Sequence, residues 1–352
     1  MLADPGRLAA SFVMASPLLD VQDLRVHFPI ASGGVFRPRR VVKAVDGVSL
    51  RIDRGRTLGV VGESGSGKTT CALAVMRLVD IAAGAVWLDG VNLAALPDAK
   101  LRQARRDVQM IFQDPYSSLN PRLRAGEIVE EPLRLAGQED DRERRDRARE
   151  LFQQVGLRQD QMVLFPHQFS GGQRQRIGVA RALALSPKLI VCDEPVSALD
   201  IAVQAQVLNL LARLQRDLRL TYLFISHDLA VIQYMCDDVA VMYLGQIVEV
   251  ASKAQLFQDP LHPYTWALLS AVPKIEIGNR GYADRVKLAG DPPSPIDIPP
   301  GCRFAGRCPF AEERCRTIAP QLREIQPGHR VACHLVAEDG SAPHANNYRS
   351  RP

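Results

Sequence analysis

The sequence predicts an α/β fold with a mostly parallel central sheet, an antiparallel β subdomain before it and a small loop-rich unit after it. Three observations lead to this prediction. Short apolar runs alternate with helical segments, which is typical of a parallel sheet covered on both faces. Residues 18–53 read as extended strands with alternating apolar positions. After Leu261 the character changes to prolines and cysteines.

Composition indicates an ordinary globular protein of two units, since 352 residues exceed what one core usually holds. The chain is 46% apolar and 24% charged with a net charge of +5, and its arginine clusters at 37–40 and 142–149 are typical of solvated surface. The N-terminus lacks the order of a signal peptide, and no run of about 18 apolar residues is present. These features predict a cytosolic protein without a membrane span.

The expected elements follow one another in a regular order. An antiparallel pair at 18–53, interrupted by an insertion at 32–40, precedes a buried strand that begins at Thr57, a glycine loop and a helix. Further strands are predicted at 107–112, 188–194 and 221–226. The segment 140–154 predicts a charged, solvated helix, 200–218 predicts a helix packed on the sheet, and 239–251 predicts a hairpin around Gly245.

The loop GESGSGKT between the first buried strand and its helix fits G-x-x-x-x-G-K-[ST] in the structural context that this motif requires. Its backbone N–H groups would surround phosphate oxygens, Lys68 would supply a positive charge and the Thr69 hydroxyl would reach Mg²⁺. A glycine turn without a ligand is disfavoured by this context. The predicted phosphate-binding set is Gly62, Ser64, Gly65, Ser66, Gly67, Lys68, Thr69 and Thr70.

Two acids end the apolar run LIVCDE at the carboxyl end of a predicted strand. Asp193 would hold Mg²⁺, directly or through water, and Glu194 would act as general base on the attacking water. Adjacent acids at a strand end are often only a solvated turn. A phosphate loop earlier in the chain makes a catalytic role the better interpretation.

Two polar residues follow other strands of the same sheet, Gln113 after 107–112 and His227 after 221–226. An amide can ligate Mg²⁺ or water, and an imidazole can donate a hydrogen bond to the γ-phosphate. Each alone would more often be structural. Because the carboxyl ends of parallel strands meet at one sheet edge, we expect both beside the phosphate loop.

The segment FSGGQRQR provides a second anion site, with Ser170, Gly171, Gly172 and Gln173 opening a helix. One nucleotide does not need two such sites. We therefore expect this segment to contact the γ-phosphate of ATP bound to another subunit.

These motifs together resemble the ATP-binding cassette of ABC-type ATPases over residues 18 to about 255. GESGSGKTT resembles its Walker A motif, Gln113 its Q-loop, FSGGQ its signature with Phe169 in place of the usual Leu, and LIVCDE its Walker B motif. SALD, ending at Asp200, resembles its D-loop and His227 its switch histidine. By position Phe28 resembles the aromatic residue that stacks on adenine, although a core phenylalanine is the usual alternative. The resemblance implies a P-loop NTPase fold with a helical subdomain at about 114–180, and ATP and Mg²⁺ as ligands.

Finer details resemble the ATP-binding subunits of dipeptide and oligopeptide importers, a group that also includes relatives moving nickel, glutathione or sugars. The segments FQDPYSSLNPR and HPYTWALLSAVP, with the proline linker and cysteines after the latter, make this resemblance. We expect a flexible N-terminus at 1–17, a cassette at 18–260, a C-terminal extension at 261–338 and a flexible tail at 339–352.

Seven cysteines in a cytosolic chain argue against disulfides, and Cys71, Cys192 and Cys236 lie in apolar patterns typical of buried positions. The others, spaced C-x₅-C-x₆-C-x₁₇-C, predict a metal site, because so small and proline-rich a segment needs a crosslink. Thiolates suit both zinc and Fe–S clusters. The importer resemblance implies a 4Fe-4S cluster, with zinc as the alternative, bound by Cys302, Cys308, Cys315 and Cys333.

The resemblance implies an ATPase at the cytoplasmic face of the membrane that energises peptide uptake. Its expected partners are two transmembrane permease subunits, a second ATPase subunit in a heterodimer and, indirectly, an extracytoplasmic solute-binding protein. Two rival hypotheses are a soluble ABC ATPase acting on nucleic acid or ribosomes and a metal-regulated sensor. The chain has neither a second cassette nor a coiled-coil insertion, which disfavours the first, and its complete catalytic set disfavours the second.

Overall fold

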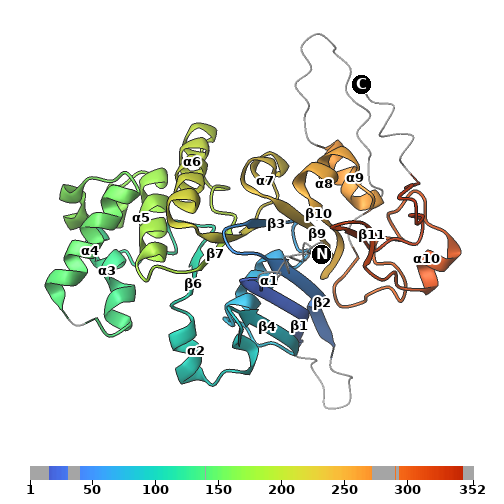
Figure 1. The fold of residues 1–352 in the computed structure, drawn as a ribbon, viewed down its shortest axis with the longest axis horizontal. Helices are drawn as coiled ribbons and strands as arrows, with labels where there is room; N and C mark the ends of the chain where they lie inside the picture. Colours follow the sequence, from blue (N-terminus) through green and yellow to red (C-terminus); the bar gives the residue numbers. More distant parts are fainter. Residues whose placement is uncertain (1–15, 31–39, 139, 272–289, 291–292, 344–352) are drawn as a thin grey trace, which may run out of the picture.

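The computed structural model describes residues 16–30, 40–138, 140–271, 290 and 293–343. Most of the predicted flexible ends and of the insertion at 32–40 lie outside these residues, as does Pro292. The described part is an elongated molecule with helices at one end, a central sheet and the C-terminal region at the other end (Figure 1).

The central sheet has eight strands in the order β11-β12-β10-β9-β3-β8-β7-β6. The predicted parallel core is confirmed, because five neighbouring strands run parallel: β6 (Val108–Ile111), β7 (Leu189–Asp193), β8 (Thr221–Ile225), β3 (Thr57–Val61) and β9 (Asp238–Tyr243). The sheet continues with antiparallel strands, so it is mixed: β10 (Gln246–Ser252), β12 (His329–Val331) and β11 (Arg323–Gln326). The β9–β10 hairpin is the one predicted around Gly245.

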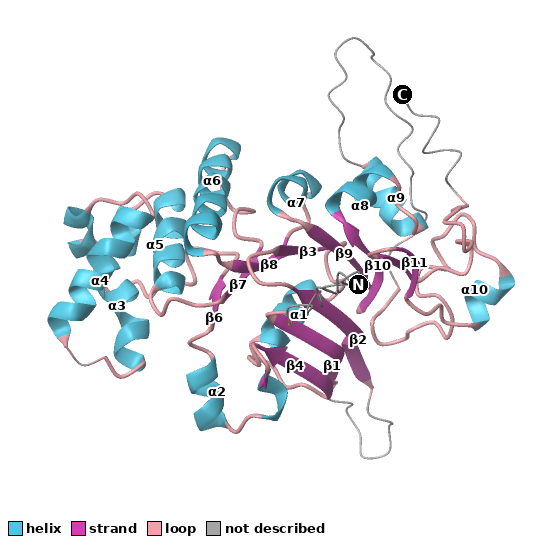
Figure 2. Ribbon diagram, in the orientation of Figure 1, coloured by secondary structure: helices cyan, strands magenta, loops and turns pink. Residues whose placement is uncertain are grey.

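A second, antiparallel sheet has the strand order β2-β1-β4-β5. The sequence analysis predicted its first two strands, β1 (Leu19–Pro29) and β2 (Val41–Ile52), and left the other two unassigned, β4 (Ala83–Leu88) and β5 (Val91–Asn92). In Figure 2 this sheet and α1 (Lys68–Val75) lie on one side of the central sheet. The opposite side carries α6 (Ile201–Leu218), α7 (Leu229–Met235), α8 (Lys253–Gln258) and α9 (Pro263–Ser270).

The helical end of the molecule is built from α3 (Ala125–Leu135), α4 (Asp141–Gln154) and α5 (Gly171–Leu183), with the 3₁₀ turns η2 (Gln159–Val163) and η3 (Pro166–Gln168). Helix α4 is solvated on one side, as predicted, but Leu151 and Phe152 are fully buried on the other. Elsewhere lie α2 (Asp98–Ala104), η1 (Leu93–Ala95) and α10 (Glu313–Thr317).

Two apolar cores form because successive strand residues point to opposite faces of the central sheet. Val191 and Leu223 pack toward the antiparallel sheet and α1. Their neighbours Cys192 and Phe224 pack toward α5, α6 and α7. The parallel strands are therefore largely apolar, with Gln109 of β6 and Asp238 of β9 as partly exposed exceptions, and further accessible polar residues follow their carboxyl ends.

The C-terminal region, residues 293–343, is joined to the rest of the fold by strand pairing and core packing. Strand β12 pairs with β10, and Ala332 N–H donates to the Val248 carbonyl oxygen at 2.8 Å. Phe304 is 1% exposed and packs in the main core beside Tyr243 and Tyr264. This region is therefore stabilised by the body on which it lies.

The predicted metal site is wrong. Among the described residues no group of three or more His, Cys, Asp or Glu side chains could hold a metal ion, and all seven cysteines are free. Burial raises the pKa of Cys302, that of Cys308 to about 11 and that of Cys333 to about 12, which favours thiols over the thiolates that metals bind. Neither the 4Fe-4S cluster nor zinc at Cys302, Cys308, Cys315 and Cys333 is supported. Cys71, Cys192 and Cys236 are buried as predicted.

Candidate active site at the carboxyl ends of the parallel strands

The predicted phosphate loop connects β3 to α1, and two of its glycines are required by the backbone. Gly67 has φ +104°, and a Cβ there would lie 2.2 Å from the Ala44 carbonyl oxygen. At Gly62 a Cβ would lie 2.1 Å from the Met242 carbonyl oxygen. Strands β2 and β9 thus approach the loop too closely for any side chain at these positions.

The Lys68 side chain binds back to the backbone of the phosphate loop. Its side chain is buried, and Nζ donates to the carbonyl oxygens of Gly62 at 2.8 Å and Glu63 at 2.9 Å. Burial lowers the pKa of Lys68, an effect that the nearby carboxylates Glu194, Asp193 and Glu63 oppose. The ammonium group is therefore held where it can meet an anion.

The hydroxyl of Ser66 is evidence that the loop fits a phosphate. Ser66 Oγ is buried and, within the described residues, has no hydrogen-bond partner. A buried hydroxyl without a partner costs free energy that a ligand oxygen could recover. The glycine geometry, the lysine and this hydroxyl together suit the phosphates of a nucleotide.

The donor set also fits Mg²⁺. Thr69, in the first turn of α1, donates from Oγ1 to Asp193 Oδ1 at 3.1 Å. Burial raises the pKa of Asp193, while the Thr69 hydrogen bond acts in the opposite direction. A hydroxyl and a carboxylate side by side are oxygen ligands of the kind that Mg²⁺ prefers. Thr69 and the next residue, Thr70, both line an open cleft.

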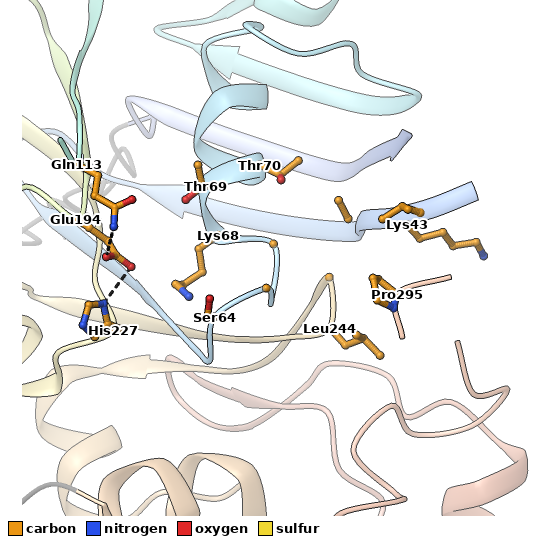
Figure 3. A pocket seen from close by; sticks show the side chains of 15 residues that line it. Lys43, Ser64, Lys68, Thr69, Thr70, Gln113, Glu194, His227, Leu244 and Pro295 are labelled. Atoms are coloured by element: carbon orange, nitrogen blue, oxygen red, sulfur yellow. Dashed lines mark hydrogen bonds and ion pairs between the residues drawn. The ribbon is translucent and has the colours of Figure 1, made fainter. Parts of the chain in front are cut away.

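Three side chains from the ends of β6, β7 and β8 meet at one point, as predicted. Gln113 Nε2 donates to Glu194 Oε2 at 2.9 Å, and His227 Nδ1 lies 3.1 Å from Glu194 Oε1. Figure 3 shows this trio facing Lys68 and Thr69. The Glu194 carboxylate is thereby held from both sides with its position fixed.

The backbone at Glu194 is unusual. Its φ is +46°, a left-handed conformation that non-glycine residues seldom adopt. Glu194 N–H donates to the Ile225 carbonyl oxygen at 3.0 Å, and Ser197 Oγ donates to the Glu194 carbonyl oxygen at 3.1 Å. Strained backbone held in place by surrounding contacts is common at functional sites.

One open cleft of about 540 Å³ is bordered by Lys68, Thr69 and Thr70 and by Gln113, Glu194 and His227, whereas Gly62, Ser66 and Asp193 are not among its lining residues. Gln113, Glu194 and His227 lie at one end, and Lys43, Leu244 and Pro295 lie at the other (Figure 3). The sequence analysis missed the second group, because these three come together only through the tertiary fold and share no local pattern.

Phe28 does not line this cleft. It is 40% exposed on β1, in register with Val42 of β2, which does line it. Its role toward adenine stays a prediction.

The second predicted anion site lies apart from the cleft within this chain. Ser170 caps α5, accepting from Gln173 N–H at 3.3 Å, while Gln173 Oε1 accepts from Ser170 N–H at 3.0 Å. Gly171 and Gly172 form the first turn, and Asp200 caps α6 by accepting from Val203 N–H at 2.9 Å. None of these residues lines the cleft, and their role toward another subunit stays a prediction.

Glu63 is a site residue that the sequence analysis did not assign. It occupies a variable position of the loop motif, so the motif itself carries no signal for it. The structure shows its carboxylate bound to Arg307 of the C-terminal region, at 2.7 and 3.1 Å.

No helix of the described chain has the length and apolar character needed to cross a lipid bilayer.

Two family models match this chain. The ABC transporter model matches residues 45–197, and the model of the oligopeptide/dipeptide transporter C-terminal region matches residues 248–315. The first match includes the phosphate loop, Gln113 and Glu194, and the second includes Cys302, Cys308 and Cys315; His227 and Cys333 lie outside both matches.

Curated relatives are similar over nearly the whole chain. A putative peptide import ATP-binding protein of Brucella ovis is 51% identical over 90% of this chain and 98% of its own length. The oligopeptide transport ATP-binding protein AppF of Bacillus subtilis is 48% identical over 91% and 98%, respectively. The dipeptide transport ATP-binding protein DppF of Escherichia coli is 45% identical over 93% and 96%.

Solved structures are similar in fold. A dimeric, post-hydrolysis form of the ATP-binding cassette MJ0796, bound to ADP and Pi, matches with a TM-score of 0.59 and 29% identity. The match covers 67% of this chain and 98% of that cassette.

Proposed function

Because this chain belongs to the ABC transporter family, among the ATP-binding proteins of peptide import, we propose that it hydrolyses ATP to energise the uptake of dipeptides or oligopeptides. The observation that carries the hydrolytic part is the Glu194 carboxylate, held by Gln113 and His227 opposite the phosphate loop. The peptide cargo is supported by relatives that are 45–51% identical.

The phosphate loop would bind the triphosphate through backbone N–H groups, with Ser64, Ser66 and Thr70 beside them and Lys68 as the cation. Thr69, Asp193 and Gln113 would hold Mg²⁺, which when bound neutralises charge on the phosphate oxygens. Phe28 would contact the adenine.

Hydrolysis would begin with a water molecule placed between Glu194 and the γ-phosphate. As the water oxygen bonds to phosphorus, the bond to the β-phosphate oxygen breaks, ADP leaves and the water proton passes to Glu194. Gln113 and His227 position that carboxylate through the two contacts described above. Most of the catalysis lies in positioning and charge neutralisation.

The site would be completed by a second ATPase subunit. Ser170, Gly171, Gly172 and Gln173, with Asp200, would face the nucleotide bound to the companion chain, and the same segments of the companion would face this cleft. The dimeric form of the similar cassette MJ0796 supports this arrangement. We propose a heterodimer, because importers of this kind often pair two related ATPases.

The same proposal places the chain at the cytoplasmic face of the membrane on two permease subunits, with a solute-binding protein delivering peptide from outside. Relatives named as peptide import and oligopeptide transport ATP-binding proteins support this proposal.

The test is Glu194→Gln, which keeps the size of the side chain and removes the base. A general base contributes about 10² to 10⁴ in rate, so ATP turnover should fall by that factor while ATP still binds. In vesicles holding the complete importer, peptide uptake should stop as well. The matched control is Glu150→Gln, the same change at an exposed position of α4. Among the described ion pairs, Glu150 pairs only with Arg147.

Undiminished turnover in Glu194→Gln would remove Glu194 from its role. Normal ATP hydrolysis in a complete importer that never responds to peptide would instead refute the cargo.

A further inference from the structure

The C-terminal region binds the phosphate loop at Glu63. The Arg307 guanidinium donates to both carboxylate oxygens of Glu63, at 2.7 and 3.1 Å. The hydroxyl oxygen of Tyr264, on α9, accepts from the Glu63 backbone N–H at 2.8 Å. The C-terminal region thus contacts the side chain of Glu63 from 244 residues away in sequence, and α9 contacts its backbone.

The side chains of Arg307 and Tyr264 are held in place by their neighbours. The Arg307 side chain is only 10% exposed and also lies 3.4 Å from the Tyr243 hydroxyl. Tyr264 is fully buried, with its ring 4.6 Å from Tyr243 and 5.4 Å from Phe304. Both side chains that bind Glu63 are therefore fixed by packing, which distinguishes them from a mobile surface ion pair.

Glu63 also connects to the lysine that would bind phosphate. Its carbonyl oxygen accepts from Lys68 Nζ at 2.9 Å, while its N–H and carboxylate are bound by Tyr264 and Arg307. A shift of Glu63 would move an acceptor that holds Lys68. The conformation of the loop is thus determined partly by the C-terminal region.

The ion pair between Glu63 and Arg307 also changes the electrostatic environment of the phosphate loop. The Glu63 side chain is 27% exposed, and its carboxylate is close enough to Lys68 that its negative charge acts to raise the pKa of the lysine. Without a cation beside it, this carboxylate would repel a triphosphate and compete for Lys68. Two hydrogen bonds from Arg307 neutralise it in a fixed geometry.

We propose that Arg307 and Tyr264 are positioning residues of the ATP site, and that the C-terminal region raises ATP affinity by holding and neutralising Glu63. This inference rests on the proposed function, since it assumes that ATP binds at the phosphate loop. Arg307 acts through Glu63 and does not itself enter the chemistry.

The main test is Arg307→Gln in the full chain, with ATP binding measured by titration of a fluorescent ATP analogue and turnover measured in parallel. Kd and KM for ATP should rise about tenfold, the factor that corresponds to 1.4 kcal/mol, with kcat within about twofold of the wild type. The charge-conserving Arg307→Lys should recover part of the affinity. Arg314→Gln, which removes an exposed arginine paired with Glu312 in the same region, is the matched control and should bind ATP normally.

The double variant Glu63→Gln/Arg307→Gln separates the electrostatic role from general damage to the fold. Because the repelling charge is gone, its ATP affinity should return to within about threefold of the wild type, while any loss of thermal stability should remain. A double variant as weak as Arg307→Gln would overturn the proposal, and so would normal affinity in Arg307→Gln.

Tyr264→Phe keeps the aromatic ring in place and provides a test if Arg307→Gln does not fold. Loss of one hydrogen-bond acceptor should weaken ATP binding about threefold, and unchanged binding would overturn the role of Tyr264. The wild-type titration separates the two proposals. A wild type that binds no ATP overturns both, whereas equal affinity in wild type and variants overturns only this one.

Discussion

Glu249 on β10 is a buried acceptor that binds both the start of α9 and the C-terminal region, and its replacement by glutamine should loosen these two segments without loosening the parallel part of the central sheet. The side chain is fully buried. Oε1 accepts from Leu261 N–H at 2.7 Å and lies 2.7 Å from His329 Nε2, while Oε2 accepts from His262 N–H at 2.9 Å. Three segments, at 249, 261–262 and 329, thus meet at one carboxylate.

Glutamine has the same shape but only one acceptor oxygen. Whichever way its amide lies, the NH₂ group faces a backbone N–H, from either Leu261 or His262. A buried donor turned toward another donor costs about 1–3 kcal/mol. A loss of about 2 kcal/mol corresponds to roughly a 30-fold increase in the population of locally opened states.

Hydrogen exchange of backbone amides measures the population of locally opened states directly. The amide of Ala332, which donates to the Val248 carbonyl oxygen where β12 meets β10, should exchange about 30-fold faster in Glu249→Gln. The amide of Tyr222, which donates to the Arg56 carbonyl oxygen in the central sheet, should keep its rate. Glu324→Gln, the same change at an exposed position of β11, is the matched control.

An unchanged rate at Ala332 would refute the reasoning, because the carboxylate would then not be holding β12. Equal acceleration at Ala332 and Tyr222 would refute it as well, since the C-terminal region would then not open separately from the sheet.

Two further predictions concern β2 and the phosphate loop. Burial acts to raise the pKa of Asp46, but the hydrogen bond and charge of Arg303, with Lys43 and His27, outweigh it and leave the pKa lowered. A lowered folded-state pKa means that the stabilisation is complete above the ordinary carboxyl pKa of about 4 and is lost as pH falls through the folded value. In urea titrations the wild type should therefore exceed Asp46→Asn in stability at pH 6, and the difference should shrink toward pH 3; a constant difference would contradict this. Gly67→Ala should abolish measurable ATP binding, because φ +104° and the contact at 2.2 Å with the Ala44 carbonyl oxygen force the loop to move. Gly90→Ala, which also has positive φ but nothing within 4 Å, is its control, and normal ATP binding by Gly67→Ala would show that the loop tolerates the shift.

The end of the cleft that holds Gln113, Glu194 and His227 was predictable because its signals are local. Each of three largely apolar strands is followed within two residues by one of these polar side chains, and the strand order β8-β7-β6 brings Gln113, Glu194 and His227 together. A parallel sheet aligns its carboxyl ends, so strand identity alone predicts proximity. The unusual φ of Glu194 was not predictable, since it depends on the contact with Ile225 of the neighbouring strand.

The opposite end of the cleft was missed because it is assembled from distant segments. Lys43 N–H donates to the Pro295 carbonyl oxygen at 3.2 Å, a contact between β2 and the C-terminal region. No periodicity or motif in either segment encodes the other. The same holds for Glu63 and Arg307.

The metal prediction failed for a related reason. It assumed that a small, proline-rich segment must stabilise itself by a crosslink. Instead, Phe304 packs among Tyr243 and Tyr264, and β12 extends the central sheet. A segment that packs into the core of a neighbouring domain does not need a crosslink to be stable. The clustering of cysteines in the sequence carries no information about this packing.

Besides the exposed pair Arg40–Asp297, three buried or partly buried ion pairs connect the C-terminal region to the rest of the described chain: Glu249–His329, Asp46–Arg303 and Glu63–Arg307. Desolvation offsets much of the attraction in such buried or partly buried pairs, so their net contribution to stability is small compared with that of apolar packing. What they determine is position, since each pair requires a particular alignment of two segments. One aligns β12 with β10, one aligns the cysteine-bearing segment with β2, and one aligns that segment with the phosphate loop. Removing the third should therefore change ATP affinity more than the free energy of unfolding.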